Sequence, residues 1–244
     1  MTASAPALVG ISHGTSSPDG RRAVRGLHDA VAAALATKHP DATPAARLGH
    51  VDVEQPDVPA ALASLAPGEP AVVVPLLLSA GYHVHVDLTE AVAATADRAV
   101  VLGGALGPDD RLATVLARRL HEAGVRDDDL VVLSVAGSSD ARAVRDCHDM
   151  RERLAAATGR DIRIGFLSAA APLLHEAVAL ARTDVPGARV VVASYLLAPG
   201  YFQDLAEAAG ADVVTEPLLV PDSPAPAELV EIVLDRYAAA TATG

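Results

Sequence analysis

The feature that most constrains the fold of this chain is an internal repeat, in which the second half of the sequence copies the first. Three segments align in order: 8–17 (LVGISHGTSS) with 130–139 (LVVLSVAGSS), 22–29 (RAVRGLHD) with 142–149 (RAVRDCHD), and 77–83 (LLSAGYH) with 196–202 (LLAPGYF). The copy lacks three polar residues of the first half, since the alignment places His13 opposite Val135, Asp52 opposite Ser168 and His83 opposite Phe202. The sequence therefore predicts a duplicated protein whose first half carries chemistry and whose second half supports it.

The chain has 244 residues, which suits two domains of ordinary size. We expect an N-terminal domain over residues 1–124 and a degenerate repeat of it over 125–244, joined in the polar segment 124–129. Apolar residues make up 51% of the chain, enough for two packed cores.

The formal net charge is −12, from 31 acidic and 19 basic residues. This balance argues against a nucleic-acid partner, because such binding depends on neutralising phosphates. We see neither a signal peptide nor an apolar run long enough to cross a bilayer, and therefore expect a cytoplasmic protein with no membrane partner.

Short apolar runs alternate with segments of helical periodicity throughout the sequence. The expected strands are 8–12, 47–53, 71–78 and 99–102 in the first half, and 130–135, 161–167, 189–197 and 213–215 in the second. Helices are expected between them. This alternation predicts the α/β class, with two similar α/β/α halves that each contain a parallel sheet flanked by helices.

Three candidate ligands follow three different strands of the first half. His13 comes directly after the first strand, Asp52 lies at the end of the second, and His83 is in the loop after the third. In open parallel sheets, ligands bind beyond the carboxyl ends of the strands, so these side chains are expected at one edge. Two imidazoles and a carboxylate suit Fe²⁺, Co²⁺, Ni²⁺ or Zn²⁺, whereas a structural zinc site would need four ligands.

Other polar residues near these positions have less specific interpretations. Glu54 and His85 each lie two residues beyond a candidate ligand and are second choices for the same roles. Gly81, which is matched by Gly200 in the copy, indicates a sharp turn or a close approach of the backbone to a flat ligand.

For several charged and titratable residues, a structural role explains the sequence at least as well as a functional one. Arg21, Arg22 and Arg25 could form a basic patch for a carboxylate-rich ligand, or a solvated or packing helix face. Cys147 fits a small core residue better than a nucleophile. Among the remaining histidines, His28 and His148 repeat in both halves, which marks them as structural, and the others show no partner pattern: His39, His50, His121 and His175.

Two motifs of the first half resemble the class II chelatases, the sirohydrochlorin chelatase family. They are His-Gly-Thr at 13–15 and VVPLLLSAGYHVHVD at 73–87. The resemblance implies a long, internally duplicated member whose halves pack as a pseudo-dimer around a cleft, as a monomer or as a homodimer. It also implies that the protein inserts Fe²⁺ or Co²⁺ into a tetrapyrrole in siroheme or cobalamin biosynthesis. The metal would be a substrate, and no prosthetic group is expected.

The resemblance also implies roles for individual residues. His13 and His83 would bind the incoming metal, and one of them would accept a pyrrole proton. Asp52, four residues before Pro56, stands where the family usually has glutamate. The macrocycle would lie over Leu78, Ser79, Ala80, Gly81 and Tyr82. Imidazole suits this chemistry, because its ordinary pKa of about 6.5 lets it take up a proton near neutral pH.

Two other functions use the same residues. A non-catalytic carrier could hold a tetrapyrrole or a metal in this pocket without turnover. An unrelated α/β hydrolase or isomerase could use His13 as a base, although the sequence lacks the Gly-x-Ser-x-Gly elbow of serine hydrolases.

Overall fold

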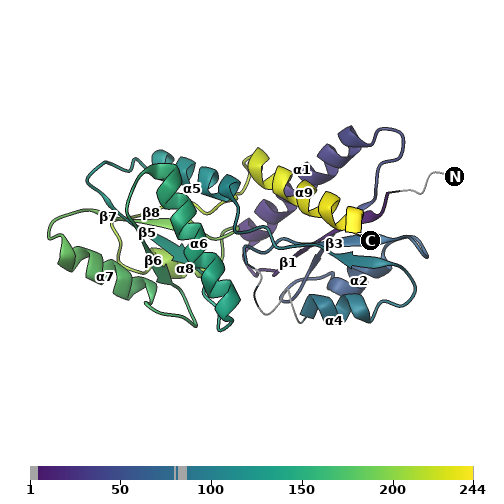
Figure 1. The fold of residues 1–244 in the computed structure, drawn as a ribbon, viewed down its shortest axis with the longest axis horizontal. Coiled ribbons are helices and arrows are strands. Elements are labelled where there is room, and N and C mark those ends of the chain that lie inside the picture. The colour runs from purple at the N-terminus through teal and green to yellow at the C-terminus, as the bar shows by residue number, and fades with distance from the viewer. Residues whose placement is uncertain (1–4, 80, 82–86, 244) are drawn as a thin grey trace. The chain divides into compact units, whose positions relative to one another are not determined.

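The computed structural model describes residues 5–79, 81 and 87–243, and it contains two separate parallel sheets (Figure 1). Each sheet has four strands, in the orders β2-β1-β3-β4 and β6-β5-β7-β8. Every strand pair is parallel, and helices flank both sheets. The predicted α/β class is therefore confirmed. Among the described residues, no helix combines the length and the apolar character that a bilayer crossing requires.

The two repeats contain the same order of elements. The first has β1 (Ala7–Ser12), α1 (Pro18–Lys38), β2 (Ala46–His50), α2 (Val58–Ala63), β3 (Ala71–Pro75), α4 (Asp87–Ala93), β4 (Val100–Leu102) and α5 (Asp110–Glu122). The second has β5 (Leu130–Val135), α6 (Ala141–Thr158), β6 (Ile162–Phe166), α7 (Leu174–Asp184), β7 (Val190–Tyr195), α8 (Tyr201–Glu207), β8 (Val213–Val214) and α9 (Ala227–Thr243).

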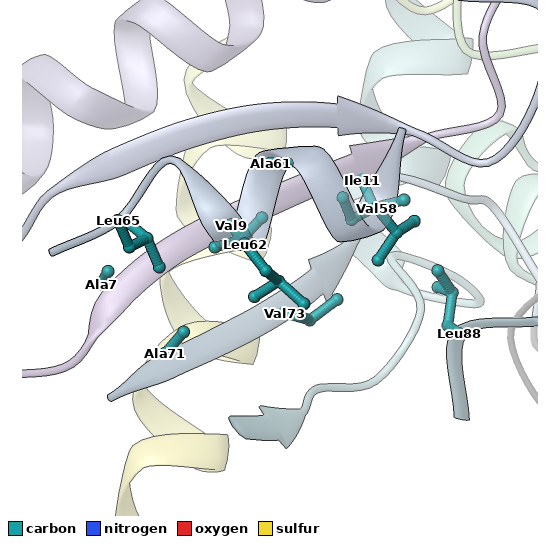
Figure 2. Close-up of a cluster of buried hydrophobic side chains, with 10 residues drawn as sticks. All are labelled: Ala7, Val9, Ile11, Val58, Ala61, Leu62, Leu65, Ala71, Val73 and Leu88. Carbon is teal, nitrogen blue, oxygen red and sulfur yellow. The ribbon is translucent and has the colours of Figure 1, made fainter. Parts of the chain in front are cut away.

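The central strands of the first sheet are apolar because both of their faces are covered. All residues of β1 and β3 are buried, as expected for parallel strands between two layers of helices. One face packs against α2 and the start of α4 through the ten side chains drawn in Figure 2: Ala7, Val9, Ile11, Val58, Ala61, Leu62, Leu65, Ala71, Val73 and Leu88. Gly49 lets α2 come this close, since a Cβ there would lie 2.8 Å from the Cβ of Ala61.

The second and third strands are shorter than the sequence predicted. We expected 47–53 and 71–78, but β2 ends at His50 and β3 ends at Pro75. After β2 the backbone turns, and Val53 takes a positive φ of 65° that no β-strand can contain. Asp52 therefore lies in a loop beyond the strand rather than at its end.

Superposing the two repeats by their hydrogen bonds corrects the alignment of the first motif by one residue. The amide of Asp52 donates to the carbonyl of His13 (3.0 Å), and the amide of Ser168 donates to the carbonyl of Ala136 (3.1 Å). Asp52 is thus opposite Ser168, as predicted, but His13 is opposite Ala136 rather than Val135. The sequence alignment followed the shared serines of LVGIS and LVVLS, whose places in the two strands differ by one.

The chain forms two compact units, and each contains the last helix of the other repeat. One unit consists of residues 1–106 and 222–244, and the other of residues 107–221. Helix α9 thus belongs to the first unit, where it packs against α1 and β3, and α5 belongs to the second, where it packs against α6 and β7. This division differs from the predicted domains 1–124 and 125–244.

Helix α9 is fixed to the first unit by both apolar and polar contacts. Its residues Leu229, Ile232 and Val233 are buried. Arg236 donates to the carbonyl of Ala105 (2.8 Å), and the Tyr237 hydroxyl donates to the carbonyl of Pro6 (2.6 Å). Helix α9 is therefore part of the hydrophobic core of the first unit.

We expect a chain truncated after residue 221 to lose the fold of the first unit while the second unit stays folded. Burial of each large aliphatic side chain contributes about 1.5–3 kcal/mol, and losing several exceeds the usual stability of a domain, about 5–15 kcal/mol. Hydrogen exchange should show β1 and β3 unprotected and β5 and β7 protected. A chain ending at Ala240 is the control and should keep both units. Native protection of β1 in the longer truncation would contradict this prediction.

Candidate functional site

The loops that carry the predicted ligands lie at one edge of the first sheet. His13 follows β1, Asp52 follows β2, and Leu78 follows β3. Strand β1 pairs with both β2 and β3 in parallel, so the carboxyl ends of all three strands point to the same edge. This is the edge at which open α/β sheets bind their ligands.

The loops after β1 and β2 are joined through their backbones. The amide of Val51 donates to the carbonyl of Ser12 (2.9 Å), and the amide of Asp52 donates to the carbonyl of His13 (3.0 Å). Gly14 has a φ of 93°, and a Cβ at this position would lie 1.9 Å from the carbonyl oxygen of Asp52. Only glycine allows this approach, which places the backbones of His13 and Asp52 next to each other.

Both of these predicted site residues are exposed. The side chains of His13 and Asp52 belong to the accessible surface of the sheet edge, while Ser12 before them is buried. One carboxylate oxygen of Asp52 accepts from the amide of Val53 (2.7 Å), which orients the group. An exposed histidine and an exposed aspartate thus lie next to each other along the backbone of this edge.

Glu54, the second choice for the acidic role, is largely buried and already has partners. Its side chain is 11% exposed, and Oε1 accepts from the amide of Thr15 (2.8 Å). Its Oε2 lies 3.3 Å from Nε of Arg21, which also donates to the carbonyl of Thr15 (2.9 Å). Glu54 therefore holds the loop after β1, whereas Asp52 is the carboxylate that a ligand can reach.

His50, to which the sequence assigned no role, is part of the same cluster. It is 5% exposed, and its Nδ1 lies 2.8 Å from Oγ of Ser12 and 3.8 Å from Oε1 of Glu54. Burial lowers the pKa of His50; the nearby Glu54 opposes this shift, and Arg25 and Arg21 add to it. The parallel register that pairs Ser12 with His50 brings this histidine to the site. That pairing cannot be predicted from the sequence of either strand alone.

The other predicted site residues are described only in part. His83, His85, Ala80 and Tyr82 lie outside the described residues, so the convergence of His83 with His13 stays a prediction. Leu78, Ser79 and Gly81 follow β3 and are partly buried. Within the part of the chain that the structure describes, no three His, Cys, Asp or Glu side chains are grouped as a metal site would require.

The arginines of the predicted basic patch have different surroundings. Arg21 is tied to Glu54, as described above, and Arg22 pairs with Asp19 (2.5 Å) and Asp222 (3.3 Å). Arg25 is exposed on the same helix, α1. The packing interpretation thus holds for Arg22, which links α1 to the segment that leads into α9.

The sequence matches the CbiX family over residues 7–123 and 130–220, which covers both repeats and most of the chain. The chain belongs to the CbiX family. This agrees with the chelatase resemblance of the His-Gly-Thr motif and of the segment after β3. No curated protein matches the chain.

Solved structures of CbiX-type proteins share the fold of the whole chain. SirB from Bacillus subtilis with Fe³⁺ has a TM-score of 0.76 at 20% identity, covering 97% of this chain and 96% of SirB. SirB from Bacillus subtilis subspecies spizizenii with cobalt has a TM-score of 0.69 at 14% identity, covering 97% and 95%. CbiX, described as the terminal enzyme of siroheme biosynthesis in denitrifying bacteria, has a TM-score of 0.62 at 19% identity, covering 94% and 98%.

We expect Gly14→Ala to destabilise this CbiX-family protein, because the new methyl group would overlap the carbonyl of Asp52 in a backbone conformation unfavourable for alanine. The strained conformation alone costs about 1–3 kcal/mol. Gly137→Ala should behave alike, since its Cβ would lie 1.9 Å from the carbonyl of Ser168. Urea denaturation measures both. Gly26→Ala in α1 is the control: nothing lies within 4 Å of its Cβ, and a gain of about 0.5–1 kcal/mol is expected.

We expect Cys147 to be unreactive in the folded protein, in line with its predicted core role. It is buried, and burial raises its pKa to about 12, with a smaller contribution from Asp146. An ordinary thiol with a pKa of about 8.5 is partly ionised at pH 8, so unfolding should speed its reaction with a disulfide reagent by about 10³-fold or more. Rapid labelling of the native protein at pH 8 would contradict this assignment.

Proposed function

We propose that this protein is a sirohydrochlorin chelatase, which inserts Fe²⁺ or Co²⁺ into the tetrapyrrole during siroheme or cobalamin biosynthesis. The observation that carries the proposal is the adjacent, exposed pair of His13 and Asp52 at the carboxyl edge of the first sheet. Membership of the CbiX family, whose match covers both repeats, supports it. The relatives whose structures hold Fe³⁺ and cobalt support a transition-metal substrate.

Metal insertion requires the loss of two pyrrole N–H protons and the stepwise loss of water from the metal. An imidazole can carry a metal ion or accept a proton near neutral pH, and we assign these roles to His13 and His83. Asp52 lies beside His13 and would orient an imidazole or accept the second proton. Leu78, Ser79, Ala80, Gly81 and Tyr82, which follow β3, would contact the macrocycle.

The retained fold of the second unit supports the assignment to the first. There, Ala136 and Ser168 occupy the positions of His13 and Asp52 on an equivalent backbone. A methyl group and a hydroxyl cannot replace an imidazole and a carboxylate as metal ligands or bases. We therefore propose a single site for each chain, on the first unit.

We expect His13→Ala and His83→Ala each to reduce metal insertion by about 10²-fold or more, because each removes a ligand or a base. The assay follows the absorbance of sirohydrochlorin with Fe²⁺, Co²⁺ or Ni²⁺ supplied separately. Asp52→Asn should also reduce the rate. His121→Ala, which removes an exposed histidine of α5, is the control and should leave the rate unchanged.

The same assay distinguishes a chelatase from a carrier. Insertion of many equivalents of metal for each protein chain supports the chelatase. One equivalent of bound tetrapyrrole or metal without turnover would support the carrier instead. Full activity of the His13→Ala, His83→Ala double variant would overturn the site.

A further inference from the structure

The two units build the same backbone at this edge of their sheets. Gly14 and Gly137 both have a positive φ and both approach a carbonyl of the neighbouring loop, so that a Cβ would lie 1.9 Å from its oxygen. Val53 and Ala169 both have a positive φ, of 65° and 57°. The scaffold of the two loops is therefore the same in both repeats.

The side chains on this scaffold differ as a group. In the first unit, Ser12, His50, Glu54 and Arg21 form a connected polar network. The hydrogen bonds and helix starts of the second unit place the following residues at these positions: Val135, Phe166, Ala170 and Val144. Apolar residues thus fill the equivalent positions, so the backbone of this edge does not require the polar network.

The network acts on the loop that follows His13. Oγ of Ser12 accepts from the amide of Gly14 (3.2 Å), and Oε1 of Glu54 accepts from the amide of Thr15 (2.8 Å). Arg21 donates to the carbonyl of Thr15 (2.9 Å) and lies 3.3 Å from Glu54. Three backbone groups in the two residues after His13 are therefore held by side chains from β1, from the loop after β2 and from α1.

His50 connects the parts of this network. Its Nδ1 lies within hydrogen-bond distance of Ser12 and 3.8 Å from Glu54, and the ring is almost fully buried. A buried polar cluster costs desolvation energy that apolar residues at the same places avoid. A cluster that the scaffold does not need, and that is absent from the equivalent positions of the second unit, is therefore expected to have a function.

We propose that Glu54, His50 and Ser12 are positioning residues, which hold the 13–15 loop so that His13 meets its metal and the macrocycle in a fixed orientation. The proposal rests on the proposed function and extends it beyond the residues that contact the substrate. It matters because a misplacement of about 1 Å can reduce a rate by about 10²-fold.

The test is the triple variant Ser12→Val, His50→Phe, Glu54→Ala, which gives the first unit the residues of the second. The variant should fold, because the same residues occupy an equivalent backbone in this very chain. We expect amide exchange of Thr15 to accelerate about tenfold or more, since its acceptor is gone. We expect kcat for metal insertion to fall about 10–100-fold, the range found when the partners of a metal-ligating histidine are removed, with a smaller change in KM for sirohydrochlorin.

Two single variants separate positioning from stability. Glu54→Gln keeps an acceptor for the Thr15 amide and should recover most of the kcat that Glu54→Ala loses. Glu176→Ala in the second unit is the matched control: it removes a carboxylate that accepts from the amide of Leu173 (2.9 Å). This control should leave kcat unchanged, whatever its effect on the melting temperature.

The outcomes are distinct. Faster exchange at Thr15 together with a lower kcat supports the proposal. Unchanged exchange in the triple variant, or faster exchange with an unchanged kcat, overturns it. If the unmodified protein fails to insert metal, the proposed function fails by itself. The exchange at Thr15 then still decides whether the network holds the loop, and unchanged exchange would overturn the positioning claim.

Discussion

The candidate site depends on one close approach, that of Gly14 to the carbonyl of Asp52. It joins the loop after β1 to the loop after β2, and two backbone hydrogen bonds from Val51 and Asp52 complete the junction. Because these loops leave neighbouring parallel strands, the junction fixes where the residues after both strands lie. The backbones of a histidine and an aspartate that are far apart in sequence thereby become neighbours.

The duplication shows which parts of this junction serve the fold and which serve the site. Glycine and the positive φ beyond the second strand occur in both units, at Gly14 and Val53 and at Gly137 and Ala169. These features close the loops and are structural. The imidazole, the carboxylates and their buried partners occur at these positions in the first unit alone, which is the pattern expected when one copy keeps a function and the other keeps the scaffold.

The sequence predicted most of the fold because its signals are local. Continuous apolar runs such as 71–75 identify buried strands, and helical periodicity predicts the helices between them. The position of α9 in the first unit could not be predicted this way. It depends on which apolar surface of the folded chain the helix buries. The repeat in the sequence would place α9 with the second copy, whereas the structure places it with the first.

The candidate site was predicted in part for the same reason. His13 and Asp52 follow strands directly, so topology alone brings them to one edge. The role of His50 requires the register that pairs it with Ser12, and the sequence alignment hid that relation because it matched Ser12 to Ser134. Glu54, the second choice two residues beyond Asp52, has its carboxylate on the amide of Thr15, a contact that the sequence could not predict.

The two acidic residues of the second loop divide their roles by electrostatics. The charge of Glu54 is compensated by Arg21 and by the amide of Thr15, and its side chain is largely removed from water. Asp52 is exposed, and its described partner is a neutral backbone amide. A cation that approaches this edge therefore meets the field of Asp52 with little contribution from Glu54. Both residues are carboxylates, so the difference lies in their surroundings: the position of Glu54 supplies a buried carboxylate with partners, and the position of Asp52 leaves its carboxylate open to solvent.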